Sequence, residues 1–152
     1  MSVSKDTPLA EITLRRYEKP DSLSDRPLVK KLCLSLGLLQ VGDSRDIVVD
    51  VLYIFLKGKG SELSSEDVQK KVIDLRKTQN LELKGVAPSN IRRQLKRLRE
   101  MYIIEKVSNN YRITEKTKLT ETFNEKIEKF ILPSIITRVK EYLTKVDEEF
   151  LQ

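Results

Sequence analysis

The sequence has no histidine, and Cys33 is the only cysteine among its 152 residues. A single cysteine cannot form an intrachain disulfide, and the lack of histidine excludes Cys/His zinc patterns and general acid–base catalysis by imidazole. No DxDxDG calcium loop or clustered acidic spacing takes their place. We therefore expect no catalytic residue, no metal and no cofactor. Cys33, within the apolar string LCLSLGLL, is interpreted as a small core residue.

Long apolar stretches are also missing. No run of about 18 uninterrupted apolar residues occurs, and the first residues, MSVSKDTPLAEITLRR, lack the apolar segment of a signal peptide. We therefore expect a cytoplasmic protein without a membrane partner. Apolar residues make up 39% and charged residues 34% of the chain, which fits one folded domain with a heavily charged surface.

Positive charge is concentrated in one segment of the chain. The formal net charge is +6 at pH 7. From Lys84 to Arg112 there are eight basic and two acidic residues, so 8 minus 2 gives +6 and the rest of the chain is neutral overall. Positive charge that is confined to one segment is typical of a nucleic-acid-binding element. The simpler alternative is that this segment is a helix face exposed to water.

Hydrophobic periodicity and capping residues predict a mainly α-helical fold. The expected helices cover residues 25–36, 45–57, 64–77 and 89–101. Before them, residues 1–22 lack periodicity and are expected to form a flexible arm, which docks through Ile12, Leu14 and Tyr17.

The third helix and the connection after it carry two further signals. Ser64 precedes Asp67 by three residues, as in the capping box that begins a helix. The connection TQNLELKGVAP breaks the helical period with a glycine and a proline, and its LEL segment (81–83) has the pattern of one short strand. Ser89 is then expected to cap the fourth helix.

The fourth helix combines an apolar face with a basic one. At 100° per residue, one narrow stripe is formed by Ile91, Leu95, Leu98 and Tyr102. The opposite side carries Arg93, Lys96, Arg97 and Glu100. Two short β-prone runs follow, IIEKV and YRIT, and the two asparagines between them tolerate a tight turn, so a small antiparallel hairpin is expected over residues 103–114.

Residues 116–152 return to a helical pattern, with an apolar residue every three or four positions. Pro133 interrupts this pattern and predicts a kink, or two helices that meet near Leu132. The apolar stripe is longer than one small domain needs, so we interpret the region as a dimerisation element. The alternative is packing against the chain's own domain. The residues assigned to the dimer are Phe123, Ile127, Ile131, Ile135, Val139, Leu143 and Val146.

The order of helix, helix, basic helix and hairpin, ending in SNIRRQLKRLREMYIIEKVSNNYRIT (89–114), resembles the recognition helix and wing of winged helix-turn-helix DNA-binding proteins. The resemblance covers roughly residues 44–115 and is to archaeal and bacterial transcriptional regulators. It implies a mainly α fold with a small β-hairpin wing: a winged-helix domain over residues 23–115, with an extra N-terminal helix, followed by C-terminal helices over 116–152. The connection before the fourth helix is longer than the family's usual tight turn.

The resemblance also implies roles for the matched positions. Residues of the fourth helix would face the major groove or its flanking phosphates, and Arg93 and Arg97 are the strongest candidates for base contacts. This set is Ser89, Asn90, Arg92, Arg93, Lys96 and Arg97. Hairpin residues would reach an adjacent minor groove or the DNA backbone. They are Lys106, Asn109, Asn110 and Arg112.

The expected function is sequence-specific binding of double-stranded DNA by a homodimeric transcriptional regulator. Its two recognition helices would enter successive major grooves about 34 Å apart. The alternative is a winged-helix module that assembles protein complexes, because this fold also serves in protein–protein interaction. No constellation of residues supports an enzyme.

Overall fold

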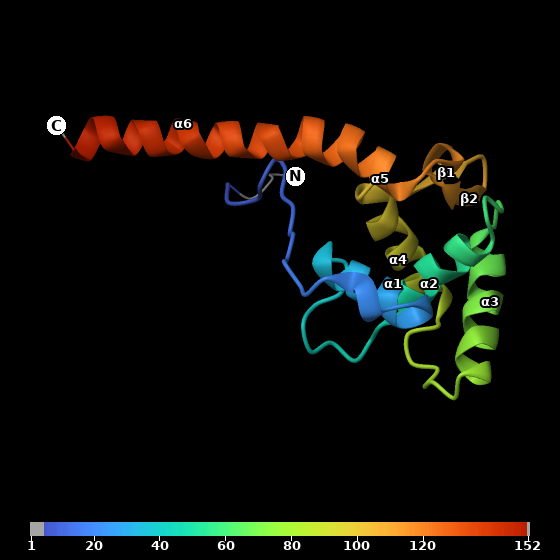
Figure 1. Cartoon of the computed structure of the whole chain (residues 1–152). Coiled ribbons are helices and arrows are strands. Elements are labelled where there is room, and N and C mark those ends of the chain that lie inside the picture. Colours follow the sequence, from blue (N-terminus) through green and yellow to red (C-terminus); the bar gives the residue numbers. More distant parts are fainter. Residues whose placement is uncertain (1–4, 152) are drawn as a thin grey trace.

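A long C-terminal helix projects from a folded core of helices and one β-hairpin (Figure 1). The computed structural model describes residues 5–151. Its mainly helical content and its small antiparallel hairpin confirm these two features of the predicted fold class. In the described part of the chain, no helix has the length and apolar character needed to cross a membrane.

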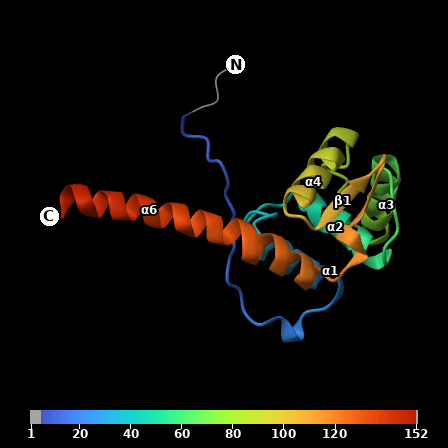
Figure 2. The ribbon, with the colours of Figure 1, turned by 90° about the horizontal axis from the view of Figure 1, so that it is seen from above.

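Helix α2 (Ile47–Lys57) lies at the centre of the core. All but its last two residues are buried, because apolar side chains cover the helix on nearly every side. Helices α1 (Asp25–Ser35), α3 (Ser65–Thr78) and α4 (Pro88–Glu100) contribute most of the remaining core, and each packs against α2. Seen from above, these helices gather at one end of the molecule and the C-terminal helix leads away from them (Figure 2).

Capping residues explain where two of these helices begin. The Ser64 side chain accepts a hydrogen bond from the Asp67 N–H at 3.1 Å, and the Asp67 carboxylate accepts one from the Ser64 N–H at 3.3 Å, which confirms the predicted capping box. Helix α4 has Ala87 as its N-cap and Pro88 as its first residue, so the prediction that Ser89 caps it is wrong. Proline suits the first position because its fixed φ is helical and a first-turn N–H has no helical acceptor.

The predicted hairpin is present. Strands β1 (Ile104–Val107) and β2 (Asn110–Ile113) pair antiparallel, residue for residue, around a turn in which Ser108 has φ 57°. Leu63, just ahead of α3, forms an isolated bridge with Tyr111 of β2, with N···O distances of 2.9 and 2.7 Å. This bridge ties the hairpin to the connection between α2 and α3.

The strand predicted at residues 81–83 is wrong, because this segment has no regular structure. The edge of β2 is already occupied by Leu63. The Glu82 carbonyl accepts a hydrogen bond from the Arg76 guanidinium, so the segment is tied to α3 through a side chain. A sequence pattern cannot reveal which of two segments reaches a sheet edge first.

The N-terminal arm, described from Lys5 onward, lies against α1 mainly through Arg15. The Arg15 N–H donates to the Ser35 carbonyl at 2.8 Å, and its guanidinium donates to the Leu34 carbonyl at 2.7 Å. Tyr17 also docks, with its ring 4.8 Å from Lys31 Nζ. The predicted docking of Leu14 is wrong, because this side chain is exposed.

The C-terminal region is one continuous helix made of three segments: α5 (Leu119–Thr122), the π-helical η3 (Phe123–Ile131) and α6 (Leu132–Phe150). Two helical segments meet at Leu132 as predicted, because η3 ends at Ile131 and α6 begins at Leu132. The backbone stays helical across this junction, with dihedral angles of −61° and −48° at Leu132. Pro133 falls just after the π segment, which is wider than an α-helix and leaves space for the proline ring.

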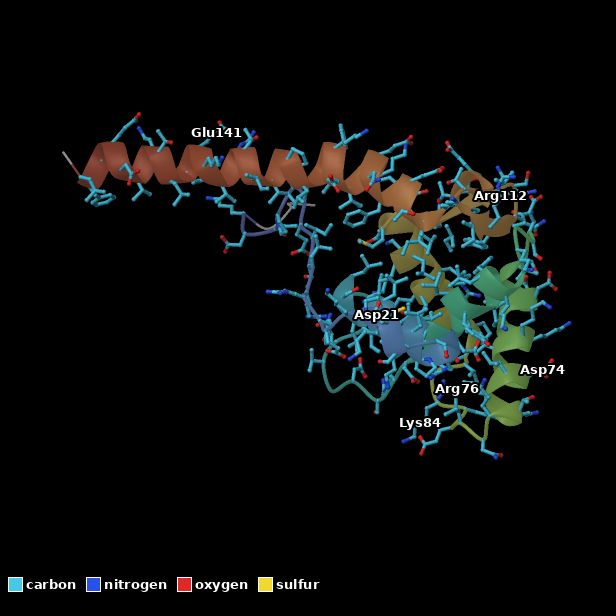
Figure 3. The ribbon with its side chains drawn as sticks, in the orientation of Figure 1. Asp21, Asp74, Arg76, Lys84, Arg112 and Glu141 are labelled. Atoms are coloured by element: carbon cyan, nitrogen blue, oxygen red, sulfur yellow. The ribbon has the colours of Figure 1, made fainter. Side chains whose placement is uncertain are left out.

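Four charged side chains form an ion cluster inside the core. Arg26 of α1 donates to Asp46 at 3.0 Å and to Asp50 at 2.9 Å. Arg76, from the last turns of α3, contacts the same two carboxylates at 3.2 and 2.5 Å. The Asp50 side chain is fully buried and that of Arg76 is 6% exposed. Arg76 lies between α3 and the α1–α2 pair (Figure 3).

Replacing Arg76 with alanine is expected to lower the free energy of unfolding by about 3–5 kcal/mol, because it leaves the Asp50 carboxylate buried without one of its two cations. Urea denaturation measures this loss. The matched control is Arg138→Ala, which removes the exposed Arg138–Glu141 pair and should cost about 0–1 kcal/mol. Equal losses in the two variants would show that the cluster does not stabilise the core.

Acid is expected to destabilise the fold through Asp46. Burial raises the pKa of this carboxyl, but the hydrogen bond and charge of Arg26, with those of Arg76, outweigh it and hold the pKa below its ordinary value. The ion pairs therefore contribute fully above the unfolded value of about 3.9 and are lost as the pH falls through the lower folded value. Urea midpoints between pH 6 and pH 2.5 should fall more steeply for the wild type than for Asp46→Asn.

Candidate nucleic-acid interface

Helix α4 presents a basic face to solvent. Ile91, Leu95 and Leu98 are fully buried, which confirms three members of the predicted apolar stripe. The fourth, Tyr102, lies beyond the end of the helix and is half-buried. Four basic side chains of this helix are exposed to solvent. They are Arg92, Arg93, Lys96 and Arg99, spaced by one, three and three residues.

Most of this charge is not neutralised. Within residues 5–151, the guanidinium groups of Arg92, Arg93 and Arg99 form no ion pair or hydrogen bond. Lys96 approaches Glu100 at 4.0 Å, but both side chains are exposed to more than 60%, so water screens this contact. The face therefore offers several cations to an external anion.

Arg97 has a different position from Arg93. It is half-buried at the side of α4, where it donates to Gln94 at 3.0 Å and to the Gly37 carbonyl at 3.4 Å. Gln94 donates to Asn90 at 3.1 Å, and Asn90 donates to the Gly85 carbonyl at 2.7 Å. This chain of hydrogen bonds fastens α4 to two loops. Asn90 and Arg97, which were predicted to contact DNA, therefore form hydrogen bonds within the protein.

The predicted hairpin residues also divide into two groups. Lys106, Asn109 and Asn110 are exposed. Arg112, on the outer side of the hairpin (Figure 3), donates to Glu105 at 2.7 Å. Burial raises the pKa of Glu105, but the Arg112 hydrogen bond, the Glu115 N–H and the Arg112 charge outweigh it and lower that pKa. Glu105 thus compensates the charge of Arg112, and Lys106 supplies the hairpin's available cation.

An open hollow of about 520 Å³ joins the helix face to the hairpin. Its basic lining residues are Lys96 and Arg99 of α4, Lys106 of β1 and Lys126 of η3. Glu100, Glu105 and Glu115 also line it. The helix, the hairpin and the first part of the C-terminal helix therefore share one surface.

Sequence reasoning missed two members of this surface. Arg99 lies 80° from Ile91 on the helical wheel and therefore 40° from Leu95, the nearest residue of the buried stripe, yet it is exposed. Lys126 comes from a segment assigned to dimerisation, and no local pattern connects it to α4. Lys84, although it lies in the basic segment, is at the end of α4 opposite the hairpin (Figure 3).

The exposure of the predicted dimerisation residues increases along the C-terminal helix. Ile127 is buried, and Phe123, Ile131 and Ile135 are half-buried. The later residues are exposed: Val139 to 52%, Leu143 to 58% and Val146 to 50%. The part of the stripe nearest the core is thus covered within the chain, and the distal part is not.

Among residues 5–151, no group of three or more Cys, Asp or Glu side chains is arranged to hold a metal ion. Cys33 is fully buried, and burial raises the pKa of its thiol to about 12. The thiol therefore stays protonated and unreactive at neutral pH.

Comparison of the chain with protein-family models, with curated proteins and with solved structures finds no match.

Arg97→Ala and Arg93→Ala are expected to differ in stability, because Arg97 is hydrogen-bonded to the rest of the protein and Arg93 is not. Loss of the Arg97 hydrogen bonds should lower the free energy of unfolding by about 1 kcal/mol, whereas Arg93→Ala should change it by less than about 0.5 kcal/mol. Urea denaturation of both variants checks this. A larger loss for Arg93→Ala would mean that the two arginines are assigned to the wrong roles.

Proposed function

We propose that this chain binds double-stranded DNA as a homodimeric transcriptional regulator of the winged helix-turn-helix type. The observation that carries the proposal is the set of exposed basic side chains on α4, next to the exposed Lys106 of the hairpin. Phosphate contacts supply most of the affinity of DNA-binding proteins, and an α-helix fits the major groove.

The order of elements supports this fold type. Helix α2 is followed by the Leu63 bridge, helices α3 and α4, and the hairpin, so the bridge adds a third short partner to the two hairpin strands. Helix α4 is then the recognition helix and the hairpin is the wing. The apolar stripe of α4 faces the core, which leaves the basic face for the groove.

The side-chain environments suggest how the roles are divided. Arg92 and Arg93 are exposed in the first half of α4, the end of a recognition helix that usually reaches the base edges. Lys96, Arg99 and Lys106 would contact phosphates on either side. Arg97 and Asn90, which are bonded to loop carbonyls, would hold the helix in position.

A second candidate function is assembly of a protein complex. The observation that favours it is the exposed apolar side of the C-terminal helix, where Phe130 is 68%, Tyr142 70% and Phe150 73% exposed. Large exposed apolar patches are typical of protein–protein contact sites. In this alternative the basic face of α4 is only a solvated surface.

Salt dependence distinguishes the two functions. Fluorescence anisotropy with a labelled random-sequence duplex should show wild-type affinity that falls steeply between 50 and 200 mM salt, as expected for about six phosphate contacts. Arg92→Ala/Arg93→Ala should bind more weakly, and the slope of log affinity against log salt should be shallower by about two.

The matched control is Lys19→Ala/Lys30→Ala, which removes the same charge from exposed positions just before and within α1. It should retain both the affinity and the slope of the wild type. Equal losses in the two double variants would indicate attraction by net charge alone. No binding by the wild type at low salt would sink the DNA-binding proposal and favour the assembly module.

A further inference from the structure

The distal part of α6 carries an apolar face that no other described segment covers. Its residues recur every three or four positions, so they lie on one side of the helix. All are exposed by 46% or more. They are Ile136, Val139, Tyr142, Leu143, Val146 and Phe150.

The N-terminal arm comes close to this face without covering it. Residues 5–10 line an open hollow together with Val139 and Tyr142, and the arm passes beside α6 in Figure 1. Leu9 nevertheless remains 96% exposed, and Tyr142 remains 70% exposed. The apolar surface is therefore left for a partner outside the chain.

Four charges beside this face are arranged with a polarity along α6. Arg138 and Lys140 precede Leu143 by five and three residues, whereas Asp147 and Glu149 follow it by four and six. All four side chains are exposed. They lie beside the apolar face at helical spacing, so they would border any helix that packs on it.

This polarity selects both the partner and its orientation. A second copy of α6 in antiparallel orientation, crossing near Leu143, brings Asp147 and Glu149 of one helix beside Arg138 and Lys140 of the other, on both sides of the pair. A parallel pair places like charges opposite each other at both positions, which is unfavourable. The same face supplies apolar side chains from both copies.

We propose that the homodimer forms by antiparallel pairing of α6 with α6 of a second copy, with these complementary charges at its edges. The inference deepens the proposed function, since it depends on the homodimer stated there. It also sets how far apart the two C-terminal helices begin. Leu119 and Leu143 are 24 residues apart, or about 35 Å of helix, so the two α5 helices begin about 70 Å apart.

This separation is close to two turns of B-DNA, each about 34 Å. The paired helices thus favour half-sites two turns apart over the one-turn spacing that the sequence suggested. Both folded cores remain free to present α4, because the pairing surface is at the far end of the C-terminal helix (Figures 1 and 2).

Charge reversal tests the orientation. Sedimentation equilibrium of the full chain should give a wild-type dimer, with Kd raised at least about tenfold in Asp147→Lys/Glu149→Lys and in Arg138→Glu/Lys140→Glu, because each variant places like charges opposite each other. The quadruple variant, which exchanges both signs, should recover the wild-type Kd. Circular dichroism confirms that each variant keeps its helix.

Cysteine cross-linking provides an independent readout, since Cys33 is fully buried and does not compete. Under mild oxidation, a mixture of Val139→Cys and Val146→Cys chains should form mainly the mixed disulfide, whereas a parallel pair would give two homodisulfides. Double variants with the wild-type Kd, or predominant homodisulfides, would overturn the antiparallel arrangement.

A wild-type chain that stays monomeric at 100 µM would overturn the pairing itself. The DNA-binding proposal is judged separately, by anisotropy at concentrations where the protein is monomeric. Salt-dependent binding that depends on Arg92 and Arg93 would then stand without the dimer. Loss of binding with an intact antiparallel dimer would contradict only the DNA-binding part.

Discussion

The buried ion cluster is the constraint on which the arrangement of the core depends. Helix α2 is apolar on nearly all sides, so its hydrophobic surface alone does not determine which side meets which neighbour. Asp46 and Asp50 remove this freedom, because buried carboxylates need cations at hydrogen-bonding distance. Arg26 brings α1 to them and Arg76 brings the end of α3. The cluster thus sets the rotation of α2 in the core.

The position of α4 follows from that core. Arg76 also bonds the Glu82 carbonyl, which anchors the connection that leads into α4. The apolar stripe of α4 then packs on α2 and α3, and the hydrogen bonds of Asn90 and Arg97 fasten its side to the loops. Arg92, Arg93, Lys96 and Arg99 remain exposed. Such a fixed helix would suit the proposed binding of DNA, because its backbone would lose little conformational entropy on binding.

The C-terminal helix connects this face to the proposed dimer. Its first turns are partly covered by the chain itself, and Lys126 there joins the basic hollow beside α4. Its distal part carries the bare apolar face and the charge polarity. A continuous helix fixes the position of one of its ends relative to the other. The π segment before Pro133 keeps this helix continuous. In the proposed dimer, the basic face and the pairing face therefore lie near opposite ends of the C-terminal helix.

The sequence by itself determined the local elements: the apolar stripe of α4, the capping box at Ser64 and the hairpin all depend on spacing within one segment. The tertiary structure decided the rest. Arg93 and Arg97 look equivalent on a helical wheel, but only the position of the loop at Gly37 shows that Arg97 is engaged. The ion cluster was equally invisible, because its four charges come from three helices and a pairing between distant residues leaves no periodic signal in the chain.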